Sequence, residues 1–285
     1  MTRKRMLAWV MAFALAVGYF PLSPVSTVEE AQAADTIPIY QDKSYSFDER
    51  AADLVARMTM AEKASQVQGS NAAGIPRLGI SNYQWWNEAI HGFSRSSGVG
   101  NPPGLLTGTS YPVSYALGAS WNPELYYDEA REIGREIRER SPGNNLNLNM
   151  YSPTINLGRD ARWGRNDESY SEDPFLTGIM GATFVQGVEG KVFNLDPDAN
   201  VEYTDGQYQQ ASTTIKHYAA NNSERNRTWS GADNVDLRAI REYYTRAYRD
   251  VIDIADVTSV MTAYSSIDGV PVSYSSYFMD TLLRQ

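Results

Sequence analysis

The amino-acid sequence predicts an α/β fold, a (β/α)8 TIM-like barrel that is incomplete at its C-terminal end. Segments with helical periodicity alternate with short strand-like stretches, a pattern typical of parallel strands joined by crossover helices. No Gly-x-Gly-x-x-Gly follows a strand, which weakens the alternative of a dinucleotide-binding open sheet. The chain is acidic, with a formal charge of -9, and has the size of a single enzyme domain. These properties favour a barrel over an open sheet.

Residues 1–33 are predicted to be a secretory signal peptide. They begin with basic residues at 3–5, continue with an apolar run over 6–20 and end in the triplet Ala31-Gln32-Ala33. An apolar run of about 15 residues is short against the ~20 that span a bilayer, so a membrane anchor is the weaker alternative. We expect cleavage after Ala33, a secreted protein of bacterial type, no membrane contact after cleavage, and a barrel domain over 34–285.

Capping signals place the first two helices. Ser46 and Glu49 have the spacing of a capping box ahead of apolar residues, which predicts a helix over 46–58. Thr59 and Glu62 repeat this spacing, so we expect a second helix to follow at once.

Three longer helices are predicted further along the chain. Asn122 before Pro123 is typical of a helix start, and residues 141–143 (Ser-Pro-Gly) end that helix. Asp173 before Pro174 begins another helix, which we expect to end near Gly187. Apolar residues at helical spacing predict a further helix over 236–252.

Strand character is found at 78–83, 115–119, 146–150, 213–216 and 258–264. A closed (β/α)8 barrel has eight strands, so about three are unaccounted for. A last predicted helix over 276–283 has no strand to precede before Gln285. We therefore expect either a smaller barrel or a fragment of a longer protein. The polar stretch 191–210 is predicted to be an exposed excursion.

Composition excludes several classes of function. The negative charge makes a nucleic acid an unlikely partner. Cysteine is absent, which rules out disulfides, thiolate metal sites and a cysteine nucleophile. The 19 tyrosines and 6 tryptophans suit both a core and a sugar-binding cleft.

Lys216 and His217 stand at the end of the predicted strand 213–216. Ligands of α/β barrels bind where the strands end. A lysine is almost never fully buried unless it is paired, so a lysine at this position requires a polar cavity. For His217 alone, a structural hydrogen-bonded histidine remains the alternative.

Two further clusters could carry chemistry. Residues 158–174 hold three arginines and five acidic groups around Trp163, either as a solvated loop of ion pairs or as a packed turn presenting Arg forks. Residues 85–92 (Trp-Trp-Asn-Glu-Ala-Ile-His-Gly) place Glu88 and His91 close together along the chain, which suits binding of a polyhydroxylated ligand. A metal site is the alternative, but no His-x-x-x-His or His-Glu-x-x-His spacing occurs.

These clusters, in the order in which they occur along the chain, resemble the N-terminal domain of glycoside hydrolase family 3, the β-glucosidases and β-xylosidases. The resemblance covers about Ser46 to Gln285 and rests on residues 85–92, 158–174, 216–222 and 259–264. It implies a modified (β/α)8 barrel. It also implies a sugar-binding site formed by Glu88, Arg165, Lys216, His217, Arg227 and Tyr264. We expect no metal and no cofactor. Glu88 stands where many members have Asp.

The mechanism implied by the resemblance is retaining hydrolysis by two carboxyl groups ~5–5.5 Å apart. The family's nucleophile is an aspartate in a Ser-Asp-Trp or Ser-Asp-Cys segment, which the 285 residues do not contain. Its usual acid/base glutamate lies on a second domain. Residues 216–222 also lack the Lys-His-Phe-Pro-Gly-His-Gly motif of the N-acetylglucosaminidase branch. We expect no catalytic residue here and a chain that is inactive alone, completed by C-terminal segments of the same protein.

Two hypotheses follow from the sequence. The first is a secreted retaining exo-β-glycosidase, a β-glucosidase or β-xylosidase that acts on small β-linked glucosides or xylosides from plant polysaccharide. The alternative is a non-catalytic carbohydrate-binding protein that retains the sugar pocket. A metal-dependent hydrolase is a third, weaker hypothesis. The DNA beyond the codon for Gln285 would separate the first two.

Overall fold

The structure is a computed structural model that describes residues 37–69, 71–95, 108–141, 148–206, 208–224 and 234–284. The predicted signal peptide, Arg227 and Gln285 lie outside these residues. The chain divides into two units, Met1–Thr59 and Met60–Gln285, which are described separately.

The first unit contains η1 (Ile39–Gln41) and α2 (Phe47–Arg57). The capping box predicted at Ser46 is confirmed, because its side chain accepts from the amide of Glu49 while the Glu49 carboxylate accepts from the amide of Ser46. The amide of Tyr40 donates to Asp53 of α2 at 3.1 Å, which ties the short helix to the longer one.

The second unit begins with α3 (Met60–Gln66) and two small hairpins. β1 (Asn71–Ala72) pairs with β2 (Tyr83–Gln84), and β3 (Asn87–Glu88) pairs with β4 (Ser94–Arg95), both antiparallel. The strand predicted over 78–83 is wrong in most of its length. Pro76 begins the 3-10 turn η2 (Pro76–Leu78), and Gly79 ends it with a φ of 66°.

A parallel sheet of three strands forms the centre of the second unit. Its order is β5 (Asn149–Met150), β6 (Ser212–Tyr218), β7 (Ser259–Thr262). The strands predicted over 213–216 and 258–264 are thus confirmed, and that over 146–150 is confirmed at 149–150, since 146 and 147 lie outside the described residues. The strands are parallel and joined by helices, as the alternating pattern predicts.

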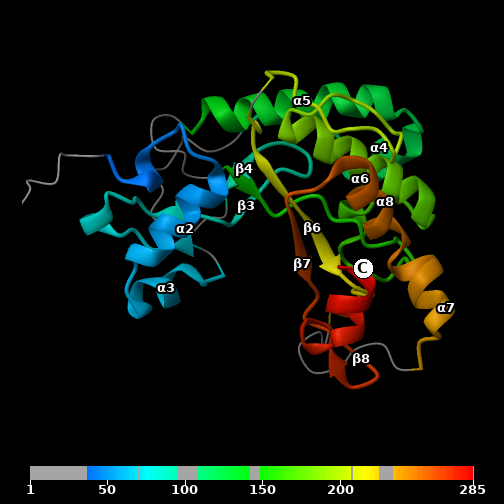
Figure 1. Cartoon of the computed structure of the whole chain (residues 1–285). Helices are drawn as coiled ribbons and strands as arrows, with labels where there is room; N and C mark the ends of the chain where they lie inside the picture. Colours follow the sequence, from blue (N-terminus) through cyan, green and yellow to red (C-terminus); the bar gives the residue numbers. More distant parts are fainter. Residues whose placement is uncertain are drawn as a thin grey trace, which may run out of the picture. The chain divides into compact units, whose positions relative to one another are not determined.

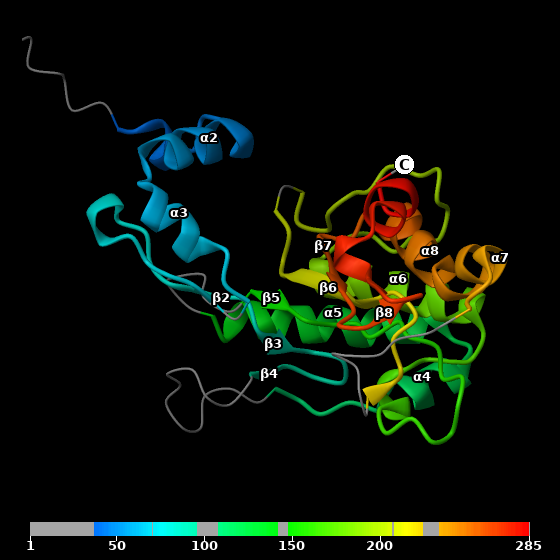
Figure 2. The same ribbon diagram turned by 90° about the horizontal axis from the view of Figure 1, so that it is seen from below.

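Helices cover the sheet. α6 (Pro174–Glu189) lies between α5 (Pro123–Glu139) and α8 (Arg246–Ala255), and it also packs on β6 (Figures 1 and 2). α6 is buried around almost its whole circumference, as expected of a helix that is apolar on all sides. Gly134 and Gly187 let α5 and α6 approach closely, because a Cβ at Gly134 would lie 2.6 Å from the carbonyl oxygen of Val188.

The predicted helix starts are confirmed by their caps. The side chain of Asn122 accepts from the amide of Leu125, and that of Asp173 accepts from the amide of Leu176. α6 ends at Glu189, close to the predicted end near Gly187, since Gly190 adopts the left-handed conformation that closes the helix.

Two elements of the structure differ in type from those predicted. Residues 115–119 are part of the helix α4 (Ser114–Ser120), not a strand, because a short apolar run does not by itself distinguish the two. The helix predicted over 236–252 is divided into α7 (Leu237–Ala239), the π-helical turn η5 (Ile240–Tyr244) and α8. Thr245 lies at the division, where both its amide and its hydroxyl donate to the carbonyl of Ile240.

After β7 the chain forms the hairpin β8 (Ser266–Ile267) and β9 (Val270–Pro271), then η6 (Val272–Tyr274) and the π-helical η7 (Tyr277–Leu282). The described residues therefore confirm an α/β fold with parallel strands. They do not confirm the predicted incomplete (β/α)8 barrel, because the parallel sheet within them has three strands. Every helix in these ranges is too short or too polar to cross a membrane.

Candidate functional site

The central strand β6 positions two of the predicted site residues. Lys216 and His217 lie near its carboxyl end, and the peptide bond between them is cis. Lys216 is flanked on one side by Met261 of β7 and on the other by Thr154, which forms a parallel bridge to it. The segment after β5 therefore extends the sheet alongside the end of β6.

Lys216 forms an ion pair with Glu88 from the β3 hairpin. Its Nζ donates to Oε1 at 2.8 Å and to Oε2 at 3.0 Å, and the hydroxyl of Ser152 donates to Oε2 at 2.9 Å. The side chain of Lys216 is 6% exposed and that of Glu88 is 34% exposed. The ammonium is thus buried and paired, whereas solvent reaches the carboxylate.

The backbone fixes Glu88 at this place. The neighbouring Asn87 is fully buried and its side-chain amide donates to the carbonyl of Asn149 in β5 at 2.9 Å. The amide of Ala89 donates to the hydroxyl of Ser152 at 3.0 Å. Residues on both sides of Glu88 are therefore bound to β5 and the segment that follows it.

Arg165 forms a second ion pair beside the first. Its Nε and Nη2 each donate to one oxygen of Glu168 at 2.6 Å, and its Nη1 lies 3.6 Å from Oε1 of Glu224. The hydroxyl of Thr154 donates to Glu168 at 2.9 Å. Because Thr154 is the bridge partner of Lys216, the two ion pairs lie side by side at the carboxyl end of the sheet.

The charges of the two ion pairs influence each other. Burial alone would raise the pKa of Glu168, but the hydrogen bonds and charge of Arg165, with the charge of Lys216, lower it. The hydrogen bonds that Arg165 donates to Glu168 raise the pKa of Arg165 against the effect of burial, and the charges of Glu168, Glu224 and Glu88 add to this. Glu168 and Arg165 are therefore both ionised at neutral pH.

His217 is held by a buried asparagine. Oδ1 of Asn156 accepts the backbone amide of His217 at 3.0 Å and lies 2.9 Å from Nδ1 of the imidazole. The amide group of Asn156 donates to the carbonyl of His217 and to the hydroxyl of Tyr248 in α8. These contacts fix the position of the ring from its Nδ1 side.

The structure places the other predicted residues as follows. Tyr264 follows β7 and is 66% exposed. Burial raises the pKa of Tyr151, and the charges of Glu88 and Tyr264 raise it further, so Tyr151 lies within electrostatic reach of both. Arg227 lies outside the described residues. Glu88, Arg165, Lys216 and His217 are therefore brought to one end of the sheet.

The loop 158–174 combines both predicted interpretations. Arg162 and Asp160 form an exposed ion pair, while Trp163 is buried and its indole donates to Glu224 at 3.2 Å. The loop is thus solvated at its tip and packed at Trp163 and Arg165.

The segment 85–92 contains the first strand and the turn of the hairpin that β3 forms with β4. Its His91 side chain is exposed, and the backbone carbonyl of His91 accepts from the amide of Tyr111. Trp86 is 44% exposed. No group of three or more metal-ligating side chains occurs among the residues that the structure describes.

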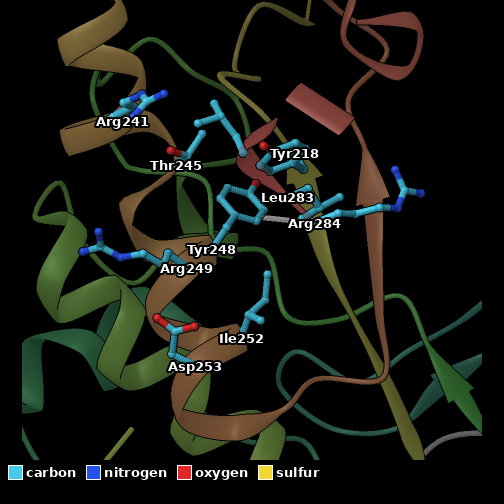
Figure 3. A pocket seen from close by; sticks show the side chains of 10 residues that line it. Tyr218, Arg241, Thr245, Tyr248, Arg249, Ile252, Asp253, Leu283 and Arg284 are labelled. Atoms are coloured by element: carbon cyan, nitrogen blue, oxygen red, sulfur yellow. The ribbon is translucent and has the colours of Figure 1, made fainter. Parts of the chain in front are cut away.

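A pocket of about 500 Å³ lies elsewhere, between α8 and the C-terminal residues (Figure 3). Tyr218, Tyr248 and Leu283 are among its lining residues, whereas none of the predicted sugar-binding residues lines it. Its arginines come from separate elements and Figure 3 shows Arg241, Arg249 and Arg284 pointing apart. We therefore base the candidate site on the ion-pair cluster and not on this pocket.

Sequence reasoning missed four residues of the cluster: Ser152, Thr154, Asn156 and Glu168. The first three follow β5 directly, and their position at the end of a predicted strand was the available signal. Glu168 lies in the loop 158–174, where its spacing of three residues from Arg165 was the available signal.

A parallel α/β sheet with basic and acidic side chains at one end of its strands is the arrangement of the ligand-binding end of α/β enzymes. Residues 95–285 match the model of the glycosyl hydrolase family 3 N-terminal domain. A xylan 1,4-β-xylosidase of Xylanibacter ruminicola is 33% identical over 263 residues, covering 88% of this chain and 28% of that protein. The chain belongs to glycosyl hydrolase family 3.

Solved structures agree with this assignment. The GH3 exo-β-xylosidase XlnD, in complex with a xylobiose aziridine activity-based probe, superposes with a TM-score of 0.74 at 31% identity, over 87% of this chain and 31% of that chain. β-Glucosidase 3B from Thermotoga neapolitana, in complex with glucose, has a TM-score of 0.65 at 27% identity, over 82% of this chain and 32% of that chain. The chain spans roughly a third of the length of these relatives.

Proposed function

We propose that this chain forms the sugar-binding part of a retaining exo-β-glycosidase, a β-xylosidase or β-glucosidase that acts on small β-linked xylosides or glucosides. The observation that carries the proposal is the ion pair between Lys216 and Glu88 at the carboxyl end of β6. The XlnD complex with its xylobiose probe and the β-glucosidase complex with glucose support the substrate class. We also propose that the parallel sheet belongs to a (β/α)8 barrel that this chain leaves incomplete.

The chemistry of the cluster suits a polyhydroxylated ring. An ionised carboxylate has about four acceptor positions, and Glu88 receives two contacts from Lys216 and one from Ser152 while 34% of its side chain is exposed. A sugar hydroxyl can donate to this exposed carboxylate. The guanidinium of Arg165, fixed by Glu168, supplies donors in a planar fork.

The proposed chemistry assigns binding, not bond cleavage, to these residues. Retaining hydrolysis needs an attacking carboxylate and an acid/base. The resemblance implies a nucleophile in a Ser-Asp segment, and the 285 residues contain no Ser-Asp pair. We therefore propose that the chain binds the sugar but does not hydrolyse a glycoside by itself.

Calorimetric titration of the 285-residue chain with xylose, xylobiose and glucose tests the binding. We expect saturable binding, weakened at least about tenfold in Lys216→Met and in Glu88→Gln, because each variant leaves a charged partner of the pair unmatched. Arg238→Met is the matched control, since Arg238 pairs with Glu242 on the surface with 78% and 61% of the side chains exposed. Absence of saturable binding by the wild-type chain would refute the proposal.

Activity assays with nitrophenyl β-xyloside and β-glucoside test the proposal that the chain does not hydrolyse a glycoside by itself. We expect no turnover by the 285-residue chain, and turnover at ordinary enzyme rates would overturn this expectation. The absence of a Ser-Asp pair also keeps the alternative of a non-catalytic carbohydrate-binding protein. An in-frame continuation of the gene into a Ser-Asp segment would favour the enzyme, whereas a natural stop codon would favour the binding protein.

Export is a separate proposal. The three-part pattern of residues 1–33 supports a signal peptide and hence a secreted protein. N-terminal sequencing of the protein from culture medium should begin at Ala34. Recovery in the cell fraction with Met1 retained would contradict it.

A further inference from the structure

Asn156 has a hydrogen-bonding pattern that defines which of its atoms faces His217. Oδ1 accepts the backbone amide of His217 at 3.0 Å, and a backbone N–H is always a donor. Nδ2 lies 3.2 Å from the carbonyl oxygen of His217, which is always an acceptor. Both contacts require the same orientation of the side-chain amide.

The orientation of Asn156 determines the role of the imidazole. Nδ1 of His217 lies 2.9 Å from the same Oδ1. A carbonyl oxygen only accepts, so Nδ1 must carry the proton and donate. In a neutral imidazole, Nε2 is then the acceptor nitrogen.

The surroundings hold Asn156 in place. The residue is 4% exposed, and its Nδ2 also donates to the hydroxyl of Tyr248 at 3.3 Å. Burial raises the pKa of Tyr248 well above its ordinary value, so this hydroxyl stays neutral. Reversing the amide would place Nδ2 against the backbone N–H of His217 and Oδ1 against its carbonyl, which leaves this donor and this acceptor without partners and is costly.

We propose that Asn156 is a positioning residue that holds His217 as the Nδ1–H tautomer, so that Nε2 accepts a hydrogen bond from a hydroxyl of the bound sugar. The ligand part of this inference rests on the proposed function. The tautomer is a property of the ligand-free chain and stands independently.

The tautomer is measurable directly because the chain contains only two histidines, His91 and His217. Long-range ¹H–¹⁵N correlation spectra of the 285-residue chain distinguish a protonated from an unprotonated ring nitrogen, and His91→Gln assigns the signals. At a pH at which the imidazole of His217 is neutral, we expect a protonated Nδ1 and an unprotonated Nε2. The Nε2–H tautomer in the wild-type chain would overturn the inference.

Two variants test the role of Asn156. Asn156→Ala removes the acceptor, and we expect loss of the fixed Nδ1–H tautomer with about tenfold weaker binding of xylobiose, as for one lost hydrogen bond. Asn156→Asp keeps an acceptor oxygen and should retain the Nδ1–H tautomer. If Asn156 only stabilised the fold, the tautomer of His217 would not depend on whether residue 156 supplies an acceptor oxygen.

The outcomes separate this inference from the proposed function. An unchanged tautomer in a folded Asn156→Ala chain overturns the inference and leaves sugar binding intact. If Asn156→Ala does not fold, Asn156→Asp decides, because an Nε2–H tautomer there is equally incompatible. Failure of the wild-type chain to bind sugar refutes the proposed function, while the ligand-free spectrum still reports the tautomer.

Discussion

Lys191 offers the sharpest test of the energetics of the fold. Its side chain is 2% exposed and its Nζ lies 2.6 Å from the fully buried carboxylate of Glu189. The ammonium also donates at 2.7 Å to the carbonyls of Ala255 and Asp256 at the end of α8. Lys191→Met keeps the length of the side chain but removes this charge.

The size of the destabilisation follows from the contacts that Glu189 keeps when Lys191 is replaced. Oε1 of Glu189 accepts from the amide and hydroxyl of Thr213 and from the hydroxyl of Thr258, at the starts of β6 and β7. Without Lys191 a buried carboxylate is left without its cation, which costs about 3–5 kcal/mol of the free energy of unfolding. Against a typical total of about 5–15 kcal/mol, this is a large fraction.

Urea denaturation followed by circular dichroism measures the loss. At about 1–3 kcal/mol per M of urea, the midpoint should fall by about 1–5 M. Adding Glu189→Gln to Lys191→Met should recover part of the loss, because it removes the unpaired charge. Arg238→Met is the control, and its exposed pair should contribute about 0–1 kcal/mol. A loss below about 1 kcal/mol for Lys191→Met would refute the reasoning.

Three further predictions concern pH, packing and the site. Burial raises the pKa of Glu129 to about 7, above its unfolded value, so its contribution to stability is complete below about pH 4.5 and is lost as the pH rises through 7. Unfolding at pH 5 and pH 8 should therefore differ by about 1–3 kcal/mol, and Glu129→Gln should remove that part of the difference. Gly134→Ala should lower the free energy of unfolding by about 1–3 kcal/mol, because its Cβ would press on the carbonyl of Val188; an unchanged melting temperature would contradict this. Glu168→Gln should weaken xylobiose binding about tenfold with folding retained, because the Arg165 fork loses its charged partner; calorimetry showing wild-type affinity would exclude this role.

Local signals predicted the helices well. The caps at Ser46, Asn122 and Asp173 lie where the sequence places them, because each cap depends on residues within three positions. The parallel strands ending near Lys216 and Thr262 were predicted from alternation of the elements. The strand predicted at 115–119 was wrong because a short apolar run has no such local signal.

The candidate site was predicted only in part. Lys216, Arg165 and Glu88 were singled out from their residue types and from family resemblance, and the structure brings them to one end of the sheet. Their partners were not predicted: Glu88 is 128 residues from Lys216 along the chain, and Asn156 is 61 residues from His217. Pairing over such separations depends on strand order, which local spacing does not report.

The sequence by itself determined the acidic, cysteine-free α/β character of the chain, the helix starts and the residue types available for chemistry. The tertiary structure alone decided which charges meet. It buried Lys191, in a stretch expected to be exposed, because the end of α6 meets the starts of β6 and β7 at Glu189. It also set Asn156 against His217, since only parallel pairing of the segment after β5 with β6 brings these two residues into contact.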